Sequence, residues 1–171
     1  MAENSMVMAC FRNRMDASEA YDFLVVRGYT RDEINVMMSN STREAYEKEG
    51  DHPVGSMVTE GVAVGGTIGT AVGATAAAIA AIGTSVALPG VGLIVAGPVL
   101  AALAGGGAGA VTGGLLGGLV GLGIPESNAK AYEATLKEGG VVIGVLPRTS
   151  NDASDIRKRF NELNGENIIS A

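Results

Sequence analysis

Charge is absent from the middle of this sequence. All thirty charged residues lie in residues 1–60 or 126–171, so the 65 residues from Gly61 to Pro125 carry no charge. By composition the chain therefore divides into two charged ends and one uncharged segment. The net charge of −6 argues against an electrostatic nucleic-acid binder, which would need a basic face to neutralise phosphates, so nucleic acid is not expected as a partner.

Cysteine and histidine occur once each, as Cys10 and His52. One cysteine forms no intramolecular disulfide, and the first twenty residues carry charges instead of an apolar signal core, so we expect a cytoplasmic location. No second histidine or further cysteine completes a metal site with Asp51 and His52. Cys10 lies among apolar residues and is expected to be a small buried side chain. We expect no catalytic residue, no metal and no cofactor, and the chain is not expected to be an enzyme.

The N-terminal end of the chain predicts a β-α-β unit. Residues 6–11, MVMACF, are typical of a short apolar strand. Asp16 opens a helix as an Asp-x-x-Glu cap with Glu19, and Gly28 ends that helix. Residues 34–38 predict the second strand.

The C-terminal end predicts the order α-β-α-β. Pro125 begins a helix, and residues 141–146 predict the strand that follows it. Asn151 or Asp152 caps a further helix, and residues 167–169 make the last strand.

These two ends predict an α+β fold, a ferredoxin-like split βαβ sandwich with right-handed crossovers. In this interpretation the uncharged segment is an α-helical hairpin inserted between the second and third strands. The expected division is 1–57 for the first half of the α+β domain with a linker, 58–124 for the hairpin, and 125–171 for the second half.

The uncharged segment contains two rows of glycines spaced four residues apart. A glycine inside a helix costs roughly 1 kcal/mol relative to alanine, so such helices form when their bare backbones meet another helix at close range. Turn residues at 88–92 and 97–98 predict a break between the arms, and Pro98 is placed to begin the second helix. The glycines predicted to mediate self-assembly are Gly61, Gly65, Gly69, Gly73, Gly105, Gly109, Gly113, Gly117 and Gly121.

Two environments for the hairpin remain open. Each arm of about 22 to 25 residues would span about 33 to 37 Å, which is membrane length. However, the segment has no Trp, Tyr or Phe for an interfacial belt, and the flanking lysines are no nearer than Lys48 and Lys130. The alternative is a soluble oligomer whose packed hairpins cover one another's apolar outer faces, such as the one made by Leu115, Leu116, Leu119 and Leu122.

Four motifs are spread over nearly the whole sequence: residues 7–11, VMACF, residues 28–34, GYTRDEI, residues 123–126, GIPE, and residues 137–140, KEGG. With these motifs the chain resembles the bacterial general stress protein 17M-like and low-temperature-induced proteins. GIPE and KEGG are the most specific parts of the resemblance. It implies a bacterial protein associated with stress responses and supplies no catalytic residues.

The functional hypothesis is a non-enzymatic, stress-linked structural protein. Its hairpins would assemble with one another, at or in the cytoplasmic membrane or in a closed soluble oligomer, so the expected partners are further copies of the chain and, in the first case, lipid. The second hypothesis is a ferredoxin-like sensor whose dimeric sheet binds a small ligand, with the hairpin as an anchor. That hypothesis needs polar groups that converge in a pocket, and Asn35 is the main candidate in the predicted strands.

Overall fold

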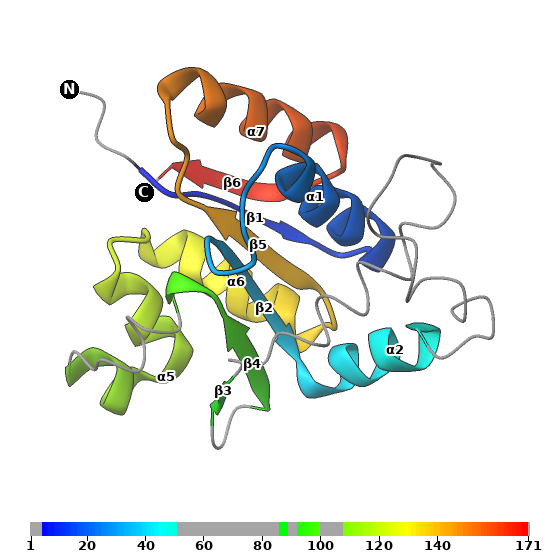
Figure 1. The fold of residues 1–171 in the computed structure, drawn as a ribbon. Coiled ribbons are helices and arrows are strands. Elements are labelled where there is room, and N and C mark those ends of the chain that lie inside the picture. The colour runs from blue at the N-terminus through cyan, green and yellow to red at the C-terminus, as the bar shows by residue number, and fades with distance from the viewer. Residues whose placement is uncertain (1–4, 51–85, 89–91, 100–107, 171) are drawn as a thin grey trace.

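The computed structural model describes residues 5–50, 86–88, 92–99 and 108–170, and the structural statements below concern these residues. They form a mixed α/β fold around an antiparallel sheet (Figure 1). The spatial order of the strands is β3-β4-β2-β5-β1-β6. The strands are β1 (Val7–Phe11), β2 (Ile34–Ser39), β3 (Val86–Leu88), β4 (Leu93–Ala96), β5 (Val141–Val145) and β6 (Glu166–Ser170).

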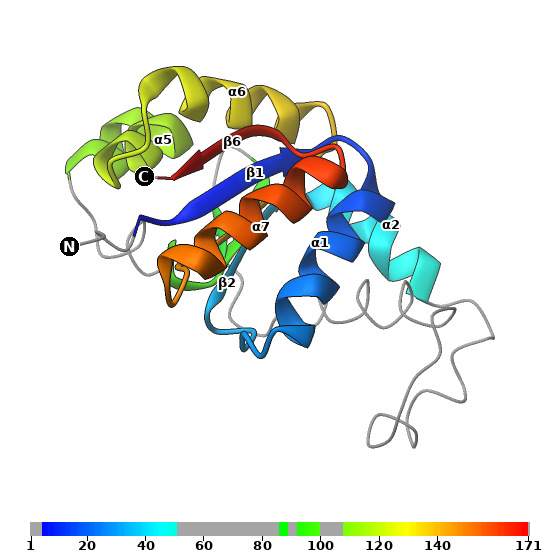
Figure 2. The same ribbon diagram turned by 90° about the horizontal axis from the view of Figure 1, so that it is seen from above.

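The sheet is covered by helices on both faces. Helices α1 (Arg14–Val26) and α7 (Ser150–Glu162) lie on one face, and α5 (Ala108–Gly121) and α6 (Glu126–Lys137) lie on the other (Figure 2). The short helix α2 (Asn40–Gly50) follows β2 directly. Because both faces are covered, every residue of β1 and β5 is buried, and these strands are continuous apolar runs with no polar alternation.

Two hydrophobic clusters fill the spaces on either side of the sheet. Alternate residues of each strand point to opposite faces, so Val7 and Ile143 belong to the cluster under α1 and α7, whereas Met8 and Val142 belong to the cluster under α5 and α6. Phe11 and Phe160 meet edge to face in the first cluster, with ring centroids 5.4 Å apart. The four strands predicted at the two ends of the chain are therefore confirmed, and they share one sheet.

The helix ends agree with the sequence predictions at glycines and differ at the N-caps. Gly28 ends α1 in the left-handed conformation, with φ at +86°, as predicted. The predicted caps Asp16 and Asn151 or Asp152 are wrong, because α1 is capped by the side chain of Asn13 and α7 by that of Thr149. Asp16 and Asp152 lie instead in the first turns, where a negative charge favours the helix dipole.

The segment expected to join two helical arms is partly sheet. Residues 86–88 and 93–96, placed at the break of the hairpin by the sequence, form β3 and β4, and β4 pairs with β2 through Val36↔Ala96 to Ser39↔Leu93. The sequence predicted a break in the helices here but no strands. The strands form because the free edge of β2 offers unpaired backbone groups, which an apolar β-branched segment can satisfy. The first predicted arm lies outside the described residues.

The second predicted arm is not one continuous helix. Pro98 and Val99 are helical, as expected for Pro98, but α5 contains a non-helical residue at Gly114, with φ at 59°. The expectation that Leu115 and Leu119 form an outer face for a partner is also wrong. Both side chains are buried, at 3% and 0% exposure, against the sheet and α6 of the same chain. The exposed face of α5 is therefore not its leucine face.

The packing of α5 can be tested with two neighbouring substitutions. Leu119→Ala should lower the free energy of unfolding by about 2 to 5 kcal/mol, because it leaves a cavity in the core. Val120→Ala, at a side chain that is 41% exposed, should change it by about 0.5 kcal/mol or less. Urea denaturation measures both values. Equal effects of the two variants would show that α5 does not pack on the sheet.

Candidate functional site

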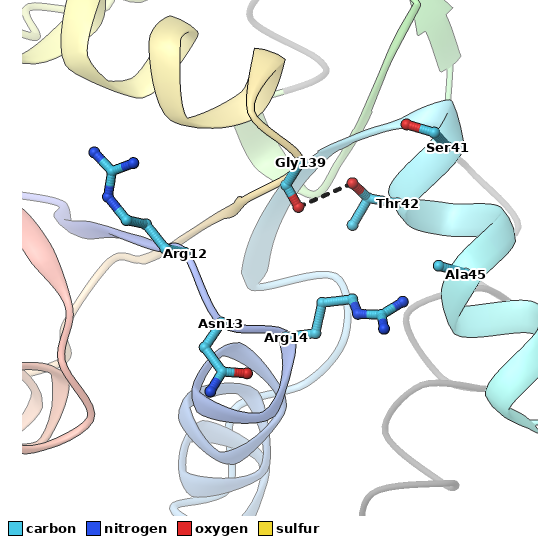
Figure 3. A pocket seen from close by; sticks show the side chains of 7 residues that line it. All are labelled: Arg12, Asn13, Arg14, Ser41, Thr42, Ala45 and Gly139. Atoms are coloured by element: carbon cyan, nitrogen blue, oxygen red, sulfur yellow. Dashed lines mark hydrogen bonds between the residues drawn. The ribbon is translucent and has the colours of Figure 1, made fainter.

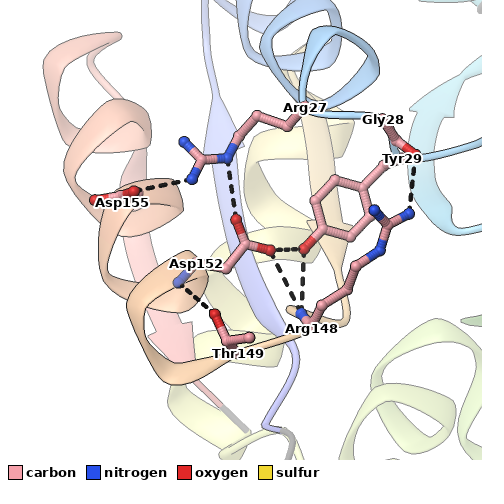
Figure 4. A network of polar contacts seen from close by, with 7 residues as sticks. All are labelled: Arg27, Gly28, Tyr29, Arg148, Thr149, Asp152 and Asp155. Carbon is pink, nitrogen blue, oxygen red and sulfur yellow. Dashed lines mark hydrogen bonds and ion pairs between the residues drawn. The ribbon is translucent and has the colours of Figure 1, made fainter.

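A cluster of polar contacts joins the loop after α1 to the start of α7. Tyr29 donates a hydrogen bond from its hydroxyl to Asp152, and the backbone N–H of Arg148 donates to the same hydroxyl at 3.2 Å (Figure 4). Arg27 donates from Nε to Asp152 at 3.0 Å and from Nη2 to Asp155 at 2.9 Å. This cluster links the two halves of the α+β domain, which are separated by more than 100 residues in the chain.

The electrostatics of this cluster favour a structural role. Partial burial disfavours the charged form of Asp152, but the hydrogen bonds from Tyr29, from the Arg148 backbone and from Arg27 outweigh that effect and lower its pKa. Burial, and then the hydrogen bond to Asp152, raise the pKa of Tyr29. Asp152 is therefore held ionised and Tyr29 is held neutral, and the two are hydrogen-bonded to each other. Neither group is set up to exchange protons near neutral pH.

A polar pocket of about 550 Å³ lies where β1 leads into α1 and β2 leads into α2 (Figure 3). Thr42 donates a hydrogen bond from its hydroxyl to the carbonyl of Gly139 at 3.0 Å across this pocket. Two cations, Arg12 and Arg14, line the pocket, and Arg12 pairs with Glu138 and with Glu166. Those carboxylates balance the charge of Arg12. Its lining residues are Arg12, Asn13, Arg14, Ser41, Thr42, Ala45 and Gly139.

An apolar pocket of about 420 Å³ lies beside the start of β2 and the end of β5. Most of its lining is hydrocarbon, and one polar side chain in it, Asn35, is 1% exposed. A volume of this size, with an apolar lining and a few placed polar groups, is typical of small-molecule sites. The lining residues are Met6, Glu33, Asn35, Pro98, Val99, Leu122, Leu146, Pro147 and Arg148.

The buried amide of Asn35 is fixed by contacts with three segments. Its Oδ1 accepts a hydrogen bond from the backbone N–H of Val99 at 2.7 Å. Its Nδ2 donates to the carbonyl of Gly144 on the neighbouring strand and to Sδ of Met6, both at 3.3 Å. Both ends of the amide are therefore occupied, and its orientation follows from these partners.

A glycine makes the contact between Asn35 and Val99 possible. Gly97 has φ at +93°, and a Cβ at this position would lie 2.4 Å from the carbonyl oxygen of Ile34. Only glycine combines this backbone conformation with so close an approach to β2. The chain can then turn after β4 and bring the N–H of Val99 onto the Asn35 side chain.

The mouth of the apolar pocket carries one ion pair. Nη2 of Arg148 lies 3.2 Å from Oε2 of Glu33 and also donates to the carbonyl of Gly28 at 2.9 Å. The hydrogen bond from the Thr30 backbone N–H, and then those from the Thr30 hydroxyl and Arg148, lower the pKa of Glu33. Glu33 therefore stays ionised at neutral pH, and the rim is electrically balanced.

Four of the nine glycines predicted for self-assembly lie on α5. A Cβ placed on Gly121, which is exposed, would meet no atom within 4 Å. With 3.6 residues per turn, Gly117 and Gly121 lie opposite Leu115 and Leu119, which face the core. The other two on this helix are Gly109 and Gly113, and the remaining predicted residues, Gly61, Gly65, Gly69, Gly73 and Gly105, lie outside the described residues.

Of the remaining candidates from the sequence, the structure describes Cys10. Cys10 is buried as predicted, and its thiol donates to the carbonyl of Glu166 at 3.3 Å. Asp51 and His52 lie outside the described residues. Within the described part of the chain, no group of three His, Cys, Asp or Glu side chains could hold a metal ion. Nor does any described helix combine the length and apolar composition needed to cross a membrane.

Sequence reasoning identified Asn35 but not the groups around it. A lone amide in an otherwise apolar strand was the usable signal. No sequence signal pointed to Gly97, Val99 and Arg148, because these residues come from segments distant in sequence that meet only after folding. Comparisons with protein-family models, curated proteins and solved structures found no match.

The polar cluster predicts a pH-dependent contribution to stability. Because the folded-state pKa of Asp152 lies below its ordinary value of 3.8, its stabilising effect is complete above that pH and is lost as the pH falls through the folded-state pKa. Asp152→Asn should lower the free energy of unfolding at pH 7 by about 1 to 3 kcal/mol, and the gap to the unmodified protein should narrow toward pH 3.

The neighbouring carboxylate is the control for this prediction. The side chain of Asp155 is 60% exposed, against 15% for Asp152, so Asp155→Asn should change stability by about 1 kcal/mol or less. Urea unfolding of the three proteins between pH 3 and pH 7 measures the difference. If the difference in free energy of unfolding between Asp152→Asn and the unmodified protein stays constant with pH, the stabilising role of ionised Asp152 is contradicted.

Proposed function

We propose that this protein is a non-enzymatic, stress-associated structural protein that self-assembles through the glycine rows of its uncharged segment. One observation carries the proposal. Gly121 of α5 is exposed, and among the described residues nothing outside its own helix turn lies within 4 Å of a Cβ placed on it. A second copy of the chain is the proposed partner, at or in the cytoplasmic membrane or in a closed soluble oligomer.

The energetics of α5 support this proposal. Each exposed glycine costs the helix roughly 1 kcal/mol relative to alanine, and within the described residues no contact at Gly121 offsets that cost. A facing helix would offset it through close backbone approach and dispersion contacts. The leucine face of α5 cannot provide this interface, because Leu115 and Leu119 already pack in the core.

We further propose that the four strands β2, β5, β1 and β6 form a ferredoxin-like core. Its support is the spatial order β2-β5-β1-β6, in which every neighbouring pair is antiparallel. The helix α1 connects β1 to β2, and α7 connects β5 to β6. Both helices cover the same face of the sheet, which is the arrangement expected of two split βαβ units.

Binding of a small ligand is the second candidate function. The version with a dimeric sheet as the ligand site is disfavoured, because α5 and α6 cover the face that α1 and α7 leave open. The apolar pocket at Asn35 is the observation that favours a ligand site elsewhere, at the end of the sheet.

The self-assembly proposal can be tested by adding volume to the glycine row. Gly121 is the last residue of α5, and Gly121→Leu places a side chain where no other described residue lies within 4 Å, so it should not destabilise a monomer. If this face is an interface, the added side chain forces the helices apart and costs about 1 to 3 kcal/mol per contact. We expect the variant to lose its oligomer, as measured by sedimentation velocity.

The matched control is Val120→Leu, an exposed neighbour on the same helix turn, which should leave the oligomer unchanged. Membrane and soluble fractions of detergent-free lysate, assayed for both variants, locate the assembly. An unchanged oligomer in Gly121→Leu, or a monomeric unmodified protein, would overturn the proposal.

A further inference from the structure

We propose that the apolar pocket binds a neutral, mostly hydrocarbon molecule with one hydrogen-bond acceptor oxygen, and that this oxygen accepts from Nδ2 of Asn35. The inference deepens the second candidate function, on which it rests, and is independent of the glycine row. Three features of the pocket carry it: its lining, the partners of the buried amide, and the charge balance at its mouth.

The lining selects an apolar body. Leu146 is 50% exposed although it directly follows the fully buried strand β5, and Met6 and Leu122 are only partly buried. Together with Val99 and Pro147 they turn apolar surface toward one concave space of about 420 Å³. A hydrocarbon group placed there would remove this surface from water, which stabilises the complex by roughly 25 cal/mol per Å².

The amide of Asn35 selects the acceptor. Its oxygen accepts a hydrogen bond from Val99, and one N–H donates to the carbonyl of Gly144. The second N–H reaches only the thioether of Met6, at 3.3 Å, and a thioether is a weak acceptor on a flexible side chain. A carbonyl, hydroxyl or ether oxygen that displaces this sulfur would satisfy a buried donor better than the protein does by itself.

The mouth of the pocket selects against charge on the ligand. Glu33 and Arg148 stand at the rim as an ion pair, so an anion drawn to Arg148 meets the carboxylate of Glu33, and a cation meets the guanidinium. A charged head would also lose its hydration in the apolar interior. A neutral ligand avoids both costs.

Three probes of equal chain length separate these features. The neutral ketone 2-octanone offers an acceptor, octanoate offers an anionic acceptor, and octylammonium offers a cation with no acceptor. Titrations of ¹⁵N-labelled protein, followed through the side-chain amide resonances of Asn35, should show 2-octanone binding at least about threefold more tightly than either ion. Against octylammonium the ratio reflects one net hydrogen bond, about two- to tenfold, and against octanoate it reflects the cost of burying a charge.

Two substitutions locate the probe. Leu146→Trp fills the pocket from an exposed position and should abolish binding of 2-octanone, whereas Val26→Trp, at an exposed residue of α1 that does not line the pocket, should leave it unchanged.

Met6→Leu keeps the side-chain volume but removes the sulfur, so the free amide loses an acceptor. Affinity for 2-octanone should then rise about two- to tenfold.

The outcomes test separately whether the pocket binds a ligand and whether that ligand is a neutral acceptor. Tighter binding of octanoate or octylammonium that Leu146→Trp abolishes would leave the ligand-binding function standing and overturn the neutral-acceptor assignment. Weaker binding of 2-octanone in Met6→Leu would likewise overturn the role of Asn35. If none of the three probes binds, or if Leu146→Trp has no effect, both the inference and the second candidate function fail.

Discussion

The central constraint on this structure is a sheet whose inner strands are apolar on both faces. Neither β1 nor β5 has a polar face to turn toward water, so two layers of helix are required. The helices α1 and α7, which connect the strands within each half, supply one layer. The second layer has to come from the residues between β2 and β5, and α5 and α6 provide it. The uncharged segment is therefore joined to the core at its C-terminal end.

This constraint explains the two unlike faces of α5. Its leucines meet the sheet because Met8, Met37 and Val142 on that face need cover, whereas Gly121 is exposed, and a Cβ placed on it would contact no other described residue within 4 Å. A helix that only completed the core would be better served by alanine or a charged residue on that outer face. The exposed Gly121 is therefore consistent with the proposed contact with another helix.

The same layering places the apolar pocket. Where α5 ends and β2 begins, the second layer does not fully cover the sheet, and Leu122 and Asn35 border the space that remains. The sharp turn at Gly97 brings Val99 across this end and fixes the amide of Asn35. Polar residues gather at the same edge, where Tyr29 and Asp152 join the two halves of the domain. The proposed ligand pocket and the polar cluster are thus neighbours at one end of the sheet.

By itself the sequence determined the strands at both ends and the glycine that stops α1, because apolar runs and left-handed glycines act over a few residues. Local pattern also singled out Asn35 as a lone amide. Only the tertiary structure decided that residues 93–96 pair with β2, that Leu119 is a core residue, and which groups surround Asn35. Those outcomes depend on which strand edge and which sheet face remain uncovered, and that is a property of the assembled sheet, to which segments far apart in sequence contribute together.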